Sequence, residues 1–129
     1  MTQVAITSVA GIGIYRADTL TEIGLLELDF RSMPDCELSF LGLVPERTGK
    51  GLGRWLIAHA TSLAWRKGVE RFWVHSCTLD SPGALGFYVR SGFTPFAREI
   101  ETFADPRLAG ILPRDAAPHV PLLDQAADA

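Results

Sequence analysis

Alternate glycines at positions 49, 51 and 53 stand between an apolar segment and an amphipathic one, and this junction limits the fold more than any other feature. Residues 36–44 are apolar except for Glu37 and Ser39, which is typical of a strand inside a sheet. Residues 51–67 are expected to form a helix, because apolar side chains recur there at helical spacing. Residues 70–79 alternate as a further strand. A strand, a helix and a strand form a crossover, so the two strands are expected to be parallel neighbours.

The segments on either side of this crossover complete the expected sheet. Residues 4–15 and 21–30 are expected to form strands, with turns at 16–20 and 32–35. Leu26, Leu28 and Phe30 alternate with acidic residues and should share one face. Gly42 fits a bulge in the strand over 36–44.

A second helix and a last strand are expected after the crossover. The helix should begin with Ser81 as its N-cap and Pro82 at its first helical position, and Gly92 should end it. The last strand is expected over 93–103, and four prolines make the tail over 105–129 irregular. The fold class is therefore α/β (α+β), with a mixed, mostly antiparallel central sheet and one parallel strand pair.

Length and composition exclude several classes of protein. The chain has 129 residues, which indicates one domain, and 12 Lys and Arg against 15 Asp and Glu give a net charge of −3. This charge argues against a nucleic-acid partner. No apolar run reaches the roughly 18 residues of a membrane span, and no secretory signal begins the chain. Cys36 and Cys77 lack metal-ligand spacing, so a cytoplasmic protein with no bound metal is expected.

The glycine-rich turn is suited to bind a phosphate or pyrophosphate. Glycine lets backbone amides approach a ligand closely, and the first amides of a helix have no partner inside it. Arg47, Lys50 and Arg54 add positive charge at this end of the helix. Neither the Walker A pattern nor the dinucleotide fingerprint fits, because Gly51 follows Lys50 and the glycines alternate. A tight turn that binds no ligand is the alternative.

Three segments in order resemble the GNAT superfamily of acetyl-CoA-dependent N-acetyltransferases. The first runs from Glu37 to Gly53, the second over 71–79, and the third is Ser-Pro-Gly-Ala-Leu-Gly-Phe-Tyr-Val-Arg-Ser-Gly-Phe over 81–93. The third is similar to the family pattern N-x-x-A-x-x-x-Y-x-x-x-G-F. The resemblance implies a GNAT-like fold in which the two parallel strands splay. It also implies an N-terminus shortened relative to the family, which carries more elements before its first hairpin.

The resemblance also implies where acetyl-CoA would bind. Backbone amides of the glycine turn would hold the pyrophosphate, and the end of the preceding strand would pair with the pantetheine arm. The residues so implied are Leu43, Val44, Thr48, Gly49, Lys50, Gly51, Leu52, Gly53, Arg54, Ser81 and Tyr88. Thr48 stands where the family usually has Arg or Gln, and Ser81 stands where it usually has Asn.

Acetyl transfer needs a base for the amine and an acid for the departing thiolate. Tyr88 is the expected acid, by its place in the third motif, and a purely structural aromatic is the alternative. Glu37 is the expected base; ordered water, or a carboxylate paired with an arginine, are the alternatives. The amide of Val44 or Leu43 is the expected oxyanion donor. His75 is expected to be buried with its hydrogen bonds satisfied; the alternative is a titratable side chain on a strand face that looks toward the substrate cleft.

The sequence thus predicts an N-acetyltransferase that moves an acetyl group from acetyl-CoA to a primary amine of a small molecule or peptide by direct attack. The alternatives are a non-catalytic acyl-CoA-binding or regulatory module with an incomplete acceptor site, and an interaction domain whose glycine turn binds nothing. The terminal strand over 4–15 would leave an exposed sheet edge, which makes a homodimer a further expectation.

Overall fold

The computed structural model describes residues 9–15, 22–49 and 51–124, and it describes side chains from residue 22 onward. The turn predicted over 16–20 and the start of the first strand lie outside these ranges. Contacts along the chain divide it into two compact units, Met1–His75 and Ser76–Ala129. The prediction of one domain stays a prediction, and the two units are described in turn.

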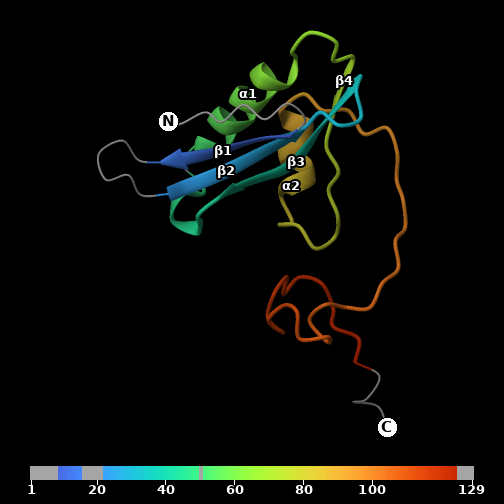
Figure 1. Ribbon diagram of the computed structural model, residues 1–129. Coiled ribbons are helices and arrows are strands. Elements are labelled where there is room, and N and C mark those ends of the chain that lie inside the picture. The colour runs from blue at the N-terminus through green and yellow to red at the C-terminus, as the bar shows by residue number, and fades with distance from the viewer. Residues whose placement is uncertain (1–8, 16–21, 50, 125–129) are drawn as a thin grey trace. The chain divides into compact units, whose positions relative to one another are not determined.

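A four-stranded sheet forms the framework of the first unit (Figure 1). Its strands, in spatial and chain order, are β1 (Val9–Tyr15), β2 (Glu22–Asp29), β3 (Asp35–Leu43) and β4 (Arg71–Trp73). The first two pairings are antiparallel, and β3 and β4 are parallel. The mixed, mostly antiparallel sheet with one parallel pair is therefore confirmed.

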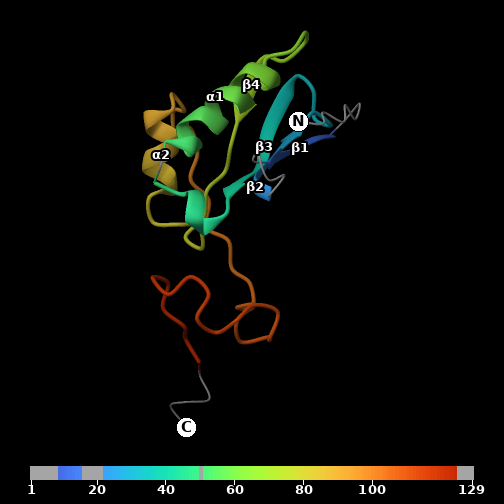
Figure 2. The ribbon, with the colours of Figure 1, turned by 90° about the vertical axis from the view of Figure 1, so that its left-hand side faces the viewer.

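The helix α1 (Leu52–Ala64) lies along one face of this sheet (Figure 2). The alternation in β2 determines which face is covered: Leu26 and Leu28 are fully buried, whereas the acidic residues between and after them are half-buried on the other side. The buried apolar residues of the core are Ile23, Leu26, Leu28, Phe30, Cys36, Leu38, Leu56, Ile57, Ala60 and Ala64. Sequence periodicity predicted the part of this core that comes from the second half of β2 and from α1.

A bulge does occur in β3, but not at Gly42 as predicted. Glu27 pairs with Phe40 and Leu28 pairs with Leu38, so Ser39 is the extra residue. Gly42 pairs regularly with Leu25. The bulge turns Phe40 to the face opposite Leu38, where its side chain is exposed.

The first helix and the fourth strand are both shorter than predicted. The helix ends at Ala64 rather than at 67, and Gly68 then turns the chain with φ 92°. The strand predicted over 70–79 contains only three residues in β4. Soon after it, the carboxylate of Asp80 accepts hydrogen bonds from the Ser76 hydroxyl and the Cys77 amide, at 2.8 Å and 3.0 Å. These local bonds favour a turn over a continued strand.

The second unit contains one regular element, α2 (Ala84–Arg90), among its described residues. Its N-cap is Gly83, so the prediction that Ser81 caps it is wrong: Ser81 instead accepts the Ala84 amide across a turn. Gly92 follows the helix with φ 101°, which confirms the predicted stop.

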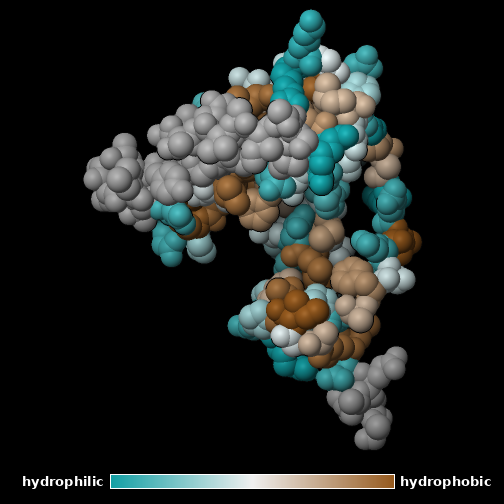
Figure 3. Space-filling view, in the orientation of Figure 1, coloured by the Kyte–Doolittle hydropathy of each residue, from teal (hydrophilic) through white to brown (hydrophobic). Residues whose placement is uncertain are grey.

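The strand predicted over 93–103 is wrong, because these residues form no regular structure. Pro95 lacks an amide hydrogen, and no sheet partner completes the segment within the part of the chain that is described. Several apolar side chains of this unit are exposed, including Ile100 and Ile111. Hydrophobic residues also gather on the visible surface of the described tail, residues 105–124 (Figure 3).

The irregular tail is organised around Arg107, whose side chain is 2% exposed. Its guanidinium donates to both carboxylate oxygens of Asp105, at 3.1 Å and 2.8 Å. It also donates to four backbone carbonyl oxygens, those of Ala116, Ala117, Val120 and Pro121. A single buried cation thus replaces the hydrophobic core in this segment. None of the described helices is long and apolar enough to cross a membrane.

Candidate active site

The glycine-rich turn leaves the N-terminus of α1 open. After a short 3₁₀ turn (Pro45–Arg47), Gly49 and Gly51 have φ 73° and φ 79°, which strongly favour glycine. Gly51 is the N-cap, and no side chain caps the helix. The amide of Trp55 donates to the Gly51 carbonyl oxygen at 3.2 Å, so the amides of residues 52–54 precede the first intrahelical bond.

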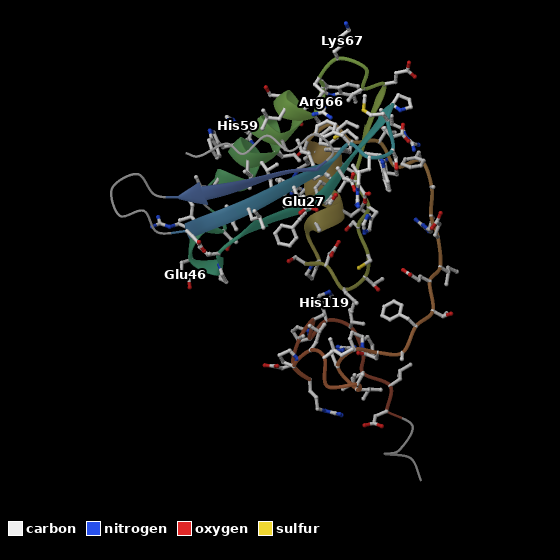
Figure 4. All side chains as sticks on the ribbon, in the orientation of Figure 1. Glu27, Glu46, His59, Arg66, Lys67 and His119 are labelled. Atoms are coloured by element: carbon white, nitrogen blue, oxygen red, sulfur yellow. The ribbon has the colours of Figure 1, made fainter. Side chains whose placement is uncertain are left out.

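Open space adjoins these glycines. A Cβ atom on Gly49 or Gly51 would meet no heavy atom within 4 Å. The positive end of the helix dipole and the exposed side chain of Arg54 favour an anion here. Glu46 lies at the short turn before α1, whereas Arg66 and Lys67 lie beyond its other end (Figure 4). Lys50 is outside the described residues.

Thr48 differs from its neighbours in the turn. Both its amide and its hydroxyl donate to the Pro45 carbonyl oxygen, at 3.2 Å and 2.8 Å. The residue therefore closes the 3₁₀ turn, and its amide is already engaged.

The parallel pair β3–β4 is short, and β3 continues past it. Pairing runs from Asp35–Arg71 to Glu37–Trp73, but β3 extends to Leu43. The Val44 amide donates to the Ile23 carbonyl oxygen at 2.9 Å, across the antiparallel side. Because neighbouring amides in an antiparallel ladder point to opposite edges, the Leu43 amide points to the edge where β4 would have continued. An extended ligand could pair with this edge.

The side chains of Glu37 and His75 meet at the end of the parallel ladder. Nδ1 of His75 lies 2.9 Å from Oε1 of Glu37. The partner of Glu37 is thus a histidine rather than an arginine. The prediction that His75 is buried is wrong, since 69% of its side-chain surface is exposed.

This pair was missed at the sequence level although a signal was present. The predicted crossover makes the strands neighbours, and their alternation gives Glu37 and His75 the same face. Only the register, which the sequence does not fix, places the two side chains within hydrogen-bond distance.

Tyr88 lies on α2 in an aromatic cluster. Its ring makes edge contacts with Phe87 and Phe93, with centroids 5.4 Å and 5.8 Å apart. Burial raises the pKa of its hydroxyl above the ordinary value, and the negative charge of Asp80 adds to this rise. The group therefore keeps its proton at neutral pH and can donate it. Ser81 is exposed in the turn before α2.

The two cysteines have opposite environments. Cys36 is fully buried in the core, and this burial raises the pKa of its thiol to about 11. Cys77 is exposed, and both cysteines are free thiols. The Cys77 thiol donates to the Asp80 carboxylate, with Sγ 3.9 Å from Oδ1.

Solved structures share this fold at low sequence identity. An acetyltransferase from Trypanosoma brucei is 19% identical, with a TM-score of 0.61 over 75% of this chain and 70% of its own. An aminoglycoside N-acetyltransferase in complex with CoA is 17% identical, with a TM-score of 0.64 over 78% of each chain. A spermidine N-acetyltransferase from Vibrio cholerae is 24% identical, with a TM-score of 0.59 over 68% of this chain and 52% of its own.

A search of curated proteins found no match. A family model, by contrast, matches residues 9–93, which include the sheet, the glycine-rich turn and α2. Its description is acetyltransferase (GNAT) family. The match covers more than half of the chain and includes all three segments that carry the resemblance. The chain therefore belongs to the GNAT family of acetyltransferases.

Proposed function

We propose that the protein transfers an acetyl group from acetyl-CoA to a primary amine of a small molecule or peptide by direct attack. The observation that carries this proposal is the uncapped N-terminus of α1 behind the left-handed Gly51, next to an edge of β3 that β4 does not cover. The structural neighbours include proteins named as acetyltransferases of spermidine and of aminoglycosides, and both names describe amine acceptors.

The geometry of the turn fits a coenzyme A pyrophosphate. The amides of Gly49, Gly51, Leu52, Gly53 and Arg54 would hold it, and Lys50 would add charge from outside the described residues. Thr48 would shape the turn with its engaged amide rather than bind. The open space where a glycine Cβ would stand supports this fit.

The arm of the coenzyme would run from this turn back along β3. The Leu43 amide, which points to the uncovered edge, would pair with it. Val44 would contribute contact only, because its amide is engaged with Ile23. When bound, the coenzyme supplies the activated acetyl group.

Binding is tested with the variant Gly51→Ala. An L-residue at φ 79° is strained, and a methyl group would project into the space proposed for the phosphates. Calorimetry with coenzyme A should show about a tenfold weaker affinity, which corresponds to about 1.4 kcal/mol.

Gly110→Ala is the matched control for this measurement. Gly110 also has a φ of 73° and open space at its Cβ position, but it lies in the C-terminal tail. Its substitution should leave the affinity unchanged. Equal losses in both variants, or no binding by the wild-type protein, would contradict the proposed pyrophosphate site.

The acid is tested with Tyr88→Phe. We propose that the Tyr88 hydroxyl protonates the departing thiolate, by its place in the third motif and because its raised pKa keeps the proton. Loss of the hydroxyl should reduce kcat by about 10²-fold and leave the Kd for coenzyme A nearly intact. The wild type should keep its activity to a higher pH than an ordinary tyrosine acid would allow.

Catalysis is tested by following thioester consumption with a panel of amines that includes a polyamine, an aminoglycoside and a peptide amine. Faster consumption with one of them identifies the acceptor class. Coenzyme A binding without transfer to any amine would support a binding module instead. Unchanged turnover in Tyr88→Phe would contradict only the assignment of the acid.

A further inference from the structure

Among the described side chains, three pairs of acidic and basic residues lie on the face of the sheet turned away from α1. They are Asp29–Arg31, Asp35–Arg71 and Glu37–His75, and all belong to the first unit. The first two pair a carboxylate with a guanidinium, which stays charged at any pH that the fold tolerates. The third differs, because a ring nitrogen of an imidazole can donate or accept a hydrogen bond, depending on the tautomer.

The Glu37–His75 pair lies at the last rung of the parallel ladder. Glu37 pairs with Trp73 there, and His75 follows two residues later on the same face. Its ring lies 6.2 Å from that of Trp73. A ligand arm that starts at the glycine-rich turn and runs back along β3 points toward this rung. The Glu37–His75 pair therefore lies on the path that such an arm would follow along β3.

The hydrogen bond determines which ring nitrogen of His75 is free. A carboxylate can only accept, so Nδ1–H donates to Oε1 of Glu37 at 2.9 Å. In the neutral ring the lone pair is then on Nε2. Because the His75 side chain is 69% exposed while that of Glu37 is 25% exposed, the imidazole is the more accessible member of the pair. This is the arrangement of a base oriented by a carboxylate.

We propose, resting on the function proposed above, that Nε2 of His75 accepts the proton of the acceptor amine and that Glu37 is a positioning residue for it. The substrate ammonium gives one proton to Nε2, and its freed lone pair forms the new C–N bond at the acyl carbon. The C–S bond breaks with its electrons on sulfur. The second nitrogen proton passes to that sulfur through water or the acid, and the imidazolium returns its proton to solvent.

The tautomer of His75 gives a test that needs no turnover. In ¹⁵N NMR spectra of the wild-type protein, the neutral His75 ring should carry its proton on Nδ1. Glu37→Ala should shift the proton to Nε2, the form that a free imidazole favours. The matched control Asp35→Asn removes the neighbouring Asp35–Arg71 pair and should leave the tautomer unchanged. A wild-type ring protonated on Nε2 would overturn the proposal.

Kinetics tests the same step. His75→Ala should reduce kcat by about 10²-fold without changing the Kd for coenzyme A, and should remove the acid limb of the pH profile. The other acidic and basic side chains on this face are those of Asp29, Arg31, Asp35 and Arg71. Imidazole added to the buffer should restore part of the rate, because the position is open to solvent. Asp35→Asn should keep the wild-type rate and profile.

The outcomes separate the two proposals. If the wild-type protein transfers acetyl to an amine and His75→Ala matches it at every pH, only the role of His75 is overturned. If the wild type transfers to no amine, the proposed function fails, and the role of His75 fails with it. A slow variant that imidazole does not restore would point to a structural role and would also overturn the proposal.

Discussion

The two units of this protein are stabilised by different interactions. In the first unit, the sheet and α1 enclose the apolar core from Ile23 to Ala64. In the second, the only buried side chain among the described residues is Arg107, and its large apolar side chains are exposed or half-buried. The hydrophobic effect thus stabilises one unit, whereas hydrogen bonds from a single guanidinium organise the tail of the other.

This difference has a consequence for function. The glycine-rich turn and the Glu37–His75 pair belong to the unit with the packed core, which can hold amides and side chains in fixed positions. Tyr88 belongs to the unit whose order depends on local turns and an aromatic cluster. Substitutions in the core of the first unit and in the tail of the second unit test this difference separately.

The largest effect is expected from Leu56→Ala. Leu56 is fully buried between α1 and the sheet, so its truncation should destabilise the protein by about 2–5 kcal/mol through lost burial and a residual cavity. Urea denaturation measures this free energy. The control Ile111→Ala, at a side chain that is 76% exposed in the second unit, should change it by less than about 0.5 kcal/mol. Comparable losses would mean that the two units share one core.

The second largest effect expected is a dependence of the free energy of unfolding on pH, caused by the Cys36 thiol. Burial raises the pKa of its thiol from 9.0 to about 11, with a nearby Arg66 opposing the rise. An unfolded chain loses this proton at lower pH than the folded one, so the stability is complete below pH 9 and declines as the pH rises through 11. The loss is roughly 2–3 kcal/mol.

Denaturation midpoints measured between neutral pH and this alkaline range check the prediction. Cys36→Val should have a shallower alkaline decline, because the titrating group is gone. Cys77→Ser, which changes the exposed thiol, should keep the wild-type decline. An identical slope in all three proteins would rule out Cys36 as its source.

Arg107→Met should have the smallest effect on the free energy of unfolding. Its effect on local structure in the tail should be large. The substitution keeps the length of the side chain and removes the guanidinium hydrogen bonds to Asp105 and to the four carbonyls, so residues 105–121 should lose protection from hydrogen exchange. Residues of β2 and α1 should keep theirs. Arg107→Lys should not restore protection, because an ammonium has three donors rather than five.

Arg114→Met is the control for this experiment. Arg114 is 61% exposed and makes one 3.3 Å contact with Asp124. Its substitution should leave the exchange pattern of the tail unchanged. If both variants open the tail equally, the buried guanidinium is not what organises it.

Local sequence patterns predicted the structure correctly where a single element determines its own conformation. The alternation in β2, the helical spacing that buries Leu56 and Ala60, and the left-handed turns at Gly68 and Gly92 all follow from short-range rules. The crossover rule was sufficient for the parallel pair. Predictions failed where the outcome depended on contacts with other residues. The strand predicted over 93–103 has no described partner, and a hydrogen bond to Asp80 turns the chain soon after β4.

Within the candidate site, the sequence indicated the residues but not all of their partners. The glycine turn, Glu37 and Tyr88 came from motifs, and Gly49 and Gly51 do adopt the positive φ that such a turn requires. That the Val44 amide is engaged, that Thr48 closes a turn and that His75 is exposed beside Glu37 all depend on register and on hydrogen bonds between segments.

By itself, the sequence determined the sheet-and-crossover architecture, the glycine-opened helix and the membership of the family, because each rests on periodicity or on local backbone chemistry. Only the tertiary structure decided the bulge at Ser39, the length of the parallel ladder and the contact between Glu37 and His75. The physical reason is that a contact between residues 38 positions apart depends on strand register, and packing of the whole sheet against α1 sets that register.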